Sequence, residues 1–195
     1  MARMNTKVVG IPDHLERALG PISKGWSDRA SEGGIQVVAF ENSPIDGVTT
    51  YSTLGLNRHL LRQPSGVAIR QELLTSVERG VTADDAARML LEIAEVIAER
   101  QSAASRGELI SLGRGISEGA SSGTFLCTAP SPFDRTSLVE TKFFDPPLIF
   151  VYLVALLDAE ADLVRSRGWQ WFEEQLEAQD PNIWDLARTK GVEVT

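Results

Sequence analysis

The chain contains few cysteine and histidine side chains, the pair of residue types that forms a thiol nucleophile with its base. Cys127 is its single cysteine, and His14 and His59 are its two histidines. A thiol needs a neighbouring base to work as a nucleophile, and Cys127 with His59 is the only Cys/His option that involves a loop edge predicted to be structured. Cys127 lies in the apolar run 124–128, which has the composition of a short strand, and free cysteines are commonly small buried hydrophobes. We therefore predict no catalytic residues.

Metal and phosphate sites are equally poorly supported. Two histidines and one cysteine cannot supply a zinc ligand set, so we predict no metal and no cofactor. A magnesium site made of carboxylates alone is retained as an alternative, because the spacing of Asp and Glu along a chain need not reveal such a site. The glycine-rich run Gly113–Gly119 lacks the Gly-Lys-Ser/Thr ending of a phosphate loop, and no helical pattern follows it. We interpret it as a surface loop.

Charge restricts the classes of partner. Nineteen Lys and Arg residues against 27 Asp and Glu give a formal net charge of −8. Nucleic acids and anionic membranes require clustered cations, so we expect neither as a partner. An acidic surface can instead steer a basic protein into contact, although mild acidity also serves solubility alone. The single cysteine suits a reducing compartment, and the apolar run Leu148–Leu157 is about half of a membrane span. We expect a cytoplasmic protein.

The first half of the chain predicts a helix, a loop and three strands that lead into a second helix. Period-two patterns over 35–40, 48–56 and 67–77 predict an antiparallel meander. A short helix over 11–20 precedes it, and the turn-rich segment 21–34 is predicted to be a loop whose Trp26 covers the core edge or anchors a partner. Apolar residues at three- and four-residue steps predict a helix over 83–100 that is capped by Thr82.

The second half predicts three more strands and two helices. Segments 108–112 and 124–128 are short strands, and Leu148–Leu157, apolar on both faces, is a central strand. A helix capped by Asp158 follows, and a second helix runs from Trp169 to about Ala178. Without a linker or an internal repeat, residues 1–195 form one domain with a core of about 10–190. The predicted class is α/β (α+β), with a central mixed, largely antiparallel sheet flanked by helices.

Six short patterns occur in an order that is characteristic of one family. In chain order they are Tyr51–Asn57, Arg70–Leu74, the helix 83–100, Gly107–Ile110, Phe125–Pro132, and the closing set Phe150–Leu157, Asp158–Arg167, Gly168 and Asp185–Arg188. Through these segments the chain resembles the Suppressor of fused (SUFU) domain over roughly residues 10–190. The resemblance implies a helix-flanked mixed sheet and a role in protein binding rather than catalysis.

The resemblance implies two possible kinds of partner. In animals the domain is the first half of a two-domain regulator that sequesters a transcription factor and grips a peptide as an added strand. Stand-alone bacterial members resemble immunity proteins that silence a cognate toxin. This chain has no length for the second animal domain, and Arg58-His59-Leu60-Leu61 replaces the animal Asp-Leu-Tyr-Gly. The animal tyrosine that contacts the peptide is therefore Leu60 here, and we do not transfer that site.

The leading hypothesis is a non-enzymatic immunity protein that binds and neutralises a cognate toxin, with a basic toxin or a peptide segment as partner. An adaptor that binds a partner peptide by strand addition is the alternative, and a hydrolase with a carboxylate site is a remote one. The predicted partner-binding residues lie in and beside one turn: Tyr51, Asn57, Arg58, His59, Leu60 and Glu72.

Overall fold

The computed structural model describes residues 10–27, 34–116, 123–133, 138, 140–141 and 145–194. Of the glycine-rich run Gly113–Gly119, residues 117–119 lie outside this part. No helix of the described residues is long and apolar enough to cross a membrane.

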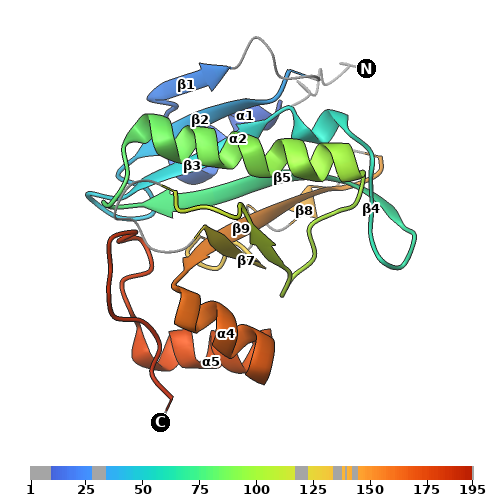
Figure 1. Ribbon diagram of the computed structural model, residues 1–195. Helices are drawn as coiled ribbons and strands as arrows, with labels where there is room; N and C mark the ends of the chain where they lie inside the picture. The colour runs from blue at the N-terminus through green and yellow to red at the C-terminus, as the bar shows by residue number, and fades with distance from the viewer. Residues whose placement is uncertain are drawn as a thin grey trace, which may run out of the picture.

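One mixed sheet organises the molecule (Figure 1). Its strands within the described residues are β1 (Lys24–Ser27), β2 (Gln36–Glu41), β3 (Thr49–Leu54), β4 (Leu61–Arg62), β5 (Ala68–Val77), β6 (Leu109–Ser111), β7 (Thr124–Thr128), β8 (Glu140–Thr141) and β9 (Leu148–Leu156). The spatial order is β1-β2-β3-β5-β9-β7-β6, with β4 beside β5 and β8 beside β9. β5 and β9 pair in parallel, and the other described pairs are antiparallel. The predicted mixed, largely antiparallel sheet is confirmed.

The helices are α1 (Ile11–Leu19), α2 (Ala83–Arg100), α4 (Asp158–Arg167) and α5 (Trp169–Gln179), and a 3₁₀ turn, η1, spans Leu56–Arg58. α2 has the predicted bounds, and the Thr82 hydroxyl accepts from the Asp85 backbone N–H at 3.1 Å as the predicted cap. The cap predicted at Asp158 is wrong by one residue. Asp158 is already helical, and the Glu160 carboxylate accepts from the backbone N–H of Leu157 at 2.8 Å.

Each face of the sheet has its own apolar core. α2 covers one face, where Leu90, Ile93 and Ile97 are fully buried against residues of β2, β3 and β5, and each contributes roughly 2 kcal/mol of burial. On the other face, residues of α1, α4 and α5 pack with the alternate residues of the same strands. β9 supplies both cores, with Val151 and Leu153 facing one and Tyr152 and Val154 facing the other. It is the predicted central strand.

The segment 21–34 contains a strand that the sequence did not predict. β1 pairs with β2 from Lys24↔Ala39 to Ser27↔Gln36. Its pattern is largely exposed, so backbone pairing rather than an apolar face holds it. The Trp26 indole N–H donates to an Asp84 carboxylate oxygen at 2.7 Å, and Lys24 pairs with the same oxygen at 3.1 Å. Trp26 thus packs partly buried at the edge of the core, as one of its two predicted roles requires.

Candidate protein-binding surfaces

The turn that follows β3 depends on one glycine. Gly55 has φ +112°, and a Cβ there would lie 2.9 Å from the carbonyl oxygen of Gly34. Only glycine accepts this conformation and this close approach without strain. The chain then winds through η1, where the His59 N–H donates to the Leu56 carbonyl at 2.9 Å, and enters β4. Residues 57–60, which we call the Asn57 turn, are thereby presented at the end of β3.

A buried carboxylate holds the Asn57 turn in place. Glu72 is fully buried in β5. Its Oε1 accepts from the Gly55 N–H at 2.8 Å, from the Asn57 N–H at 3.2 Å and from the Asn57 side-chain amide. Its Oε2 accepts from the Thr53 hydroxyl at 2.5 Å. Such charge-assisted hydrogen bonds are among the stronger ones, so Glu72 positions the turn from beneath.

Burial raises the pKa of Glu72, and the hydrogen bonds from Thr53, Asn57 and Gly55 oppose that shift. No ion pair joins Glu72 to Arg58 or Arg70 among the described residues. Arg70 instead donates from Nη1 to the Asn57 carbonyl at 2.7 Å, which holds the turn from its other side.

The six predicted contact residues differ in their access to a partner. Arg58 and Leu60 are exposed, Leu60 by 50%, while Asn57 and His59 are half-buried. Tyr51 and Glu72 are buried. Tyr51 packs on Trp26 with ring centroids 5.8 Å apart, on the α2 side of the sheet. In this conformation Tyr51 and Glu72 support the surface from within, and direct contact stays a prediction for the other four.

Cys127 and His59, the candidate nucleophile and its base, lie in different elements. Cys127 is buried in β7, whereas His59 follows η1, and no hydrogen bond joins them among the described residues. Burial is the largest cause that raises the pKa of Cys127, to about 12. A thiol with that pKa holds almost no thiolate near pH 7. Cys127 is therefore a core residue, as its strand pattern predicted.

Two segments match the Gly-x-Ser-x-Gly pattern of serine hydrolases, 115–119 (Gly-Ile-Ser-Glu-Gly) and 119–123 (Gly-Ala-Ser-Ser-Gly). In those enzymes the serine sits on a turn from a strand into a helix. Here strand β7 begins directly after the second segment, at Thr124. Residues 117–122, which include the central serine of each segment, lie outside the described part of the chain. Within that part, no group of three or more His, Cys, Asp or Glu could hold a metal ion.

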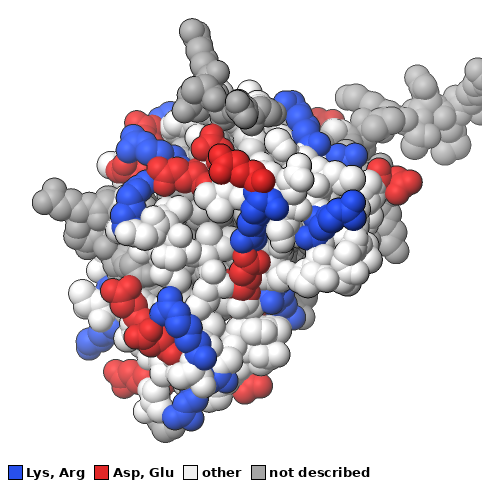
Figure 2. Space-filling view, turned by 45° about the vertical axis from the view of Figure 1, so that its right-hand side comes forward, with Lys and Arg blue, Asp and Glu red and all other residues white. Residues whose placement is uncertain are grey.

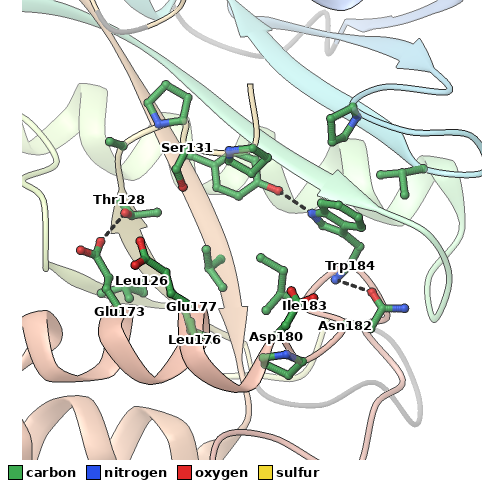
Figure 3. A pocket seen from close by; sticks show the side chains of 18 of the residues that line it. Leu126, Thr128, Ser131, Glu173, Leu176, Glu177, Asp180, Asn182, Ile183 and Trp184 are labelled. Carbon is green, nitrogen blue, oxygen red and sulfur yellow. Dashed lines mark hydrogen bonds between the residues drawn. The ribbon is translucent and has the colours of Figure 1, made fainter. Parts of the chain in front are cut away.

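A second candidate surface, which is concave, lies on the sheet face opposite α2. It is a cavity of about 980 Å³ between the turn 44–48, the loop 129–132, helix α5 and the turn 180–184, which we call the α5 groove (Figure 3). Leu126, Tyr152 and Val154 of β7 and β9 form its floor. The Trp184 indole N–H donates to the Tyr152 hydroxyl at 3.1 Å and ties the turn 180–184 to that floor.

The α5 groove combines apolar and acidic side chains. Leu176, Ile183 and Trp184 are half-buried on its walls, and Ile45 on its rim is 53% exposed. Its charged lining residues are one arginine and five carboxylates: Arg106, Asp46, Glu78, Glu173, Glu177 and Asp180. No sequence pattern indicates this groove, because its walls come from segments far apart along the chain.

Comparisons with known proteins agree with the fold and with the family patterns. The family model described as Suppressor of fused protein (SUFU) matches residues 31–189. Immunity protein YqcF of Bacillus subtilis (strain 168) is 20% identical over 172 residues, covering 88% of each chain.

Solved structures of low identity share the architecture. A putative SUFU homolog from Neisseria gonorrhoeae FA 1090 has a TM-score of 0.73 at 16% identity and covers 93% of this chain and 94% of its own. The Sufu–Fu complex gives a TM-score of 0.69 at 14% identity, with 93% and 90% covered. Drosophila Suppressor of Fused gives 0.59 at 16% identity, and this chain spans 42% of its length. Because the family model extends over most of the sequence and these structures share its sheet and helices, the chain belongs to the Suppressor of fused family.

Proposed function

We propose that the chain is a non-enzymatic, cytoplasmic immunity protein that binds and neutralises a cognate toxin. The observation that carries this proposal is the similarity to Immunity protein YqcF, which extends over 88% of both chains. Matching length favours a shared role for the whole molecule over a shared fragment. The low pKa that a cysteine nucleophile needs is absent at Cys127, and this also favours binding over catalysis.

The Asn57 turn and the α5 groove are the two surfaces that suit a protein partner. The turn presents exposed Arg58 and Leu60 on a rigidly held backbone, and such preorganisation lowers the entropy lost on binding. The groove offers half-buried apolar side chains surrounded by charges, which is the usual composition of a protein interface.

Growth rescue tests the proposal. Each toxin-like protein encoded beside this gene is expressed in a sensitive host, with and without the chain, and growth and co-purification are measured. We expect one toxin to be tolerated only when the chain is present, in a complex that survives purification. If no neighbouring toxin is neutralised or bound, the immunity role is wrong.

Strand addition to a partner peptide is a second candidate, favoured by the sheet edges. Within the described residues, β1 and β6 end the strand order and each pairs with one neighbour. An edge strand offers unpaired backbone groups to an incoming strand. Hydrogen exchange of the complex distinguishes the candidates, because strand addition protects backbone amides of β1 or β6. Protection confined to the Asn57 turn or the α5 groove argues against it.

A further inference from the structure

The α5 groove has the right size and position for a segment of a protein chain. Its volume, about 980 Å³, lies at the upper end of the range for small-molecule sites. Asp46, Glu177 and Asp180 line the cavity and come from different segments of the chain. Because all three are exposed, the cavity opens to the surface. An occupant would meet the apolar floor at the centre and charges around it.

Four of the five carboxylates of the groove form no ion pair within the described residues. Arg106 is already neutralised, because its Nη2 donates to Glu173 at 2.6 Å. Glu78 accepts from the Asn182 side-chain amide at 2.5 Å, which leaves its negative charge in place. Asp46, Glu177 and Asp180 form no ion pair with any described residue. The lining therefore carries five negative charges against one positive charge.

The local excess of carboxylates at the α5 groove indicates the charge of a partner more directly than the net charge of the whole chain does. On the face that Figure 2 shows, Lys and Arg side chains are interspersed with Asp and Glu. The formal charge of −8 therefore does not form one continuous acidic surface there. At the α5 groove the uncompensated carboxylates lie next to Ile45, Leu176 and Ile183, where an occupant would bring its own cations close to them.

We propose that the α5 groove binds a protein segment in which an aliphatic or aromatic side chain is flanked by lysines or arginines. The apolar side chain rests on Leu176 and Ile183, above Tyr152, and the cations pair with Asp46, Glu177 and Asp180 on opposite walls. This proposal rests on the proposed function, since the segment belongs to the neutralised toxin. The toxin would therefore contact the chain through a basic segment with an apolar residue at its centre. This contact would lie in the α5 groove and not at the Asn57 turn.

A peptide probe tests the groove directly. The probe is a short fluorescent peptide in which lysine and leucine alternate, and its counterpart replaces lysine with glutamate. We expect the lysine peptide alone to bind, with an affinity that falls as salt is added. The groove variant carries Asp46→Lys and Glu177→Lys, and the control carries Asp13→Lys and Glu174→Lys, which change the net charge equally. The groove variant should bind at least about tenfold more weakly, and the control as the wild type does.

The control separates a specific site from general attraction. Glu174 is exposed on the same helix as Glu177, and Asp13 is exposed on α1, and neither lines the groove. Equal weakening in both variants, or no binding of the lysine peptide to the wild type, overturns the proposal. Circular dichroism confirms that all variants are folded. As a second measurement, Ile45→Ser should weaken binding severalfold, while Val96→Ser, a similarly exposed residue of α2, should not.

Growth rescue then separates this proposal from the proposed function. If the groove variant loses rescue while the control retains it, both hold. If the groove variant rescues as well as the wild type does, the groove proposal is wrong and the immunity role stands. If the wild type rescues from no toxin but the peptide result holds, the immunity role and the assignment of the segment to a toxin are wrong, and the preference of the groove for a basic segment with an apolar centre stands.

Discussion

Glu72 shows how a single buried carboxylate can position a surface turn. Its two oxygens have different environments. Oε1 accepts from three donors of Gly55 and Asn57. Among the described residues, Oε2 accepts only from the Thr53 hydroxyl, which itself accepts from the Leu73 N–H. A hydroxyl can reverse its role from donor to acceptor. A proton on Oε2, or an amide in its place, therefore fits without disturbing the bonds of Oε1.

Two substitutions of Glu72 should differ sharply. Glu72→Gln can keep the acceptor for Gly55 and Asn57 and turn its amide towards Thr53, so we expect a loss of at most about 1 kcal/mol of unfolding free energy. Glu72→Ala leaves those buried N–H groups without an acceptor and should lose about 3 kcal/mol. Urea denaturation of both variants measures the difference. Equal losses would contradict the role of Oε1.

The ionisation of Glu72 should make the free energy of unfolding depend on pH. Because burial raises its pKa in the fold, the folded state holds more protons than the unfolded state between the ordinary glutamate pKa and the raised one. Its contribution to stability is therefore greatest below that window and is lost as the pH rises through it. The free energy of unfolding of the wild type relative to Glu72→Gln should fall across the window. Glu174→Gln, at an exposed site, should follow the wild type.

The thiol of Cys127 should not react with thiol reagents in the folded protein. Its thiol is buried and its pKa is raised to about 12, so both access and thiolate are lacking. We expect reaction with a thiol reagent such as a maleimide to require unfolding, and to proceed at the normal rate in denaturant. Rapid labelling of the native protein would show that Cys127 is accessible and would reopen its role as a nucleophile.

At the scale of elements, a buried ion pair fastens the C-terminal segment to α4. Arg188 donates from Nη2 to Glu160 at 2.7 Å and to the Ala155 carbonyl at 2.8 Å, and both charged side chains are almost fully buried. Glu160 also accepts from the Val192 N–H at 3.1 Å. The family pattern Asp185–Arg188 thus has a structural reason, since its arginine joins β9, α4 and the tail.

A double-mutant cycle tests this ion pair. Arg188→Met leaves Glu160 buried without its cation and should lose about 3 kcal/mol or more of unfolding free energy, and Glu160→Leu a similar amount. The double variant should lose less than the sum of the singles, because neither charge remains. An additive result would show that the pair contributes no coupling.

The sequence predicts those elements in which the pattern of apolar residues shows which positions are buried. α2 was predicted with its bounds because its apolar residues follow the helical period, and β9 because it is apolar on both faces. β1 was missed because only Trp26 in it is partly buried. The parallel pairing of β5 with β9 also has no local signal, since it joins strands that are about 80 residues apart.

The candidate site was predictable only in part for the same reason. Gly55 and Asn57 mark a turn in the sequence, and that turn exists. The function of Glu72 depends on the register of β5 against β3, so its residue type alone could not show that it points inward. The α5 groove depends on tertiary assembly, because residues 44–48 meet residues 173–184 only in the folded chain.

At the scale of the whole molecule, the two cores should unfold together. They lie on opposite faces of one sheet, and β9 contributes alternate side chains to both. We therefore expect calorimetry to show one transition whose calorimetric and van't Hoff enthalpies agree, as for a single two-state domain. Two separable transitions would contradict the single domain.

The floor and the walls of the α5 groove are subject to different constraints. Tyr152 and Val154 of the floor are buried in the core that α1, α4 and α5 share, so substitutions there endanger folding. The wall residues Ile45 and Asp46 are exposed and can vary at little cost to stability. If the chain acts as proposed, changes confined to the exposed loops would alter which partner is bound, while the sheet and its two cores stay unchanged.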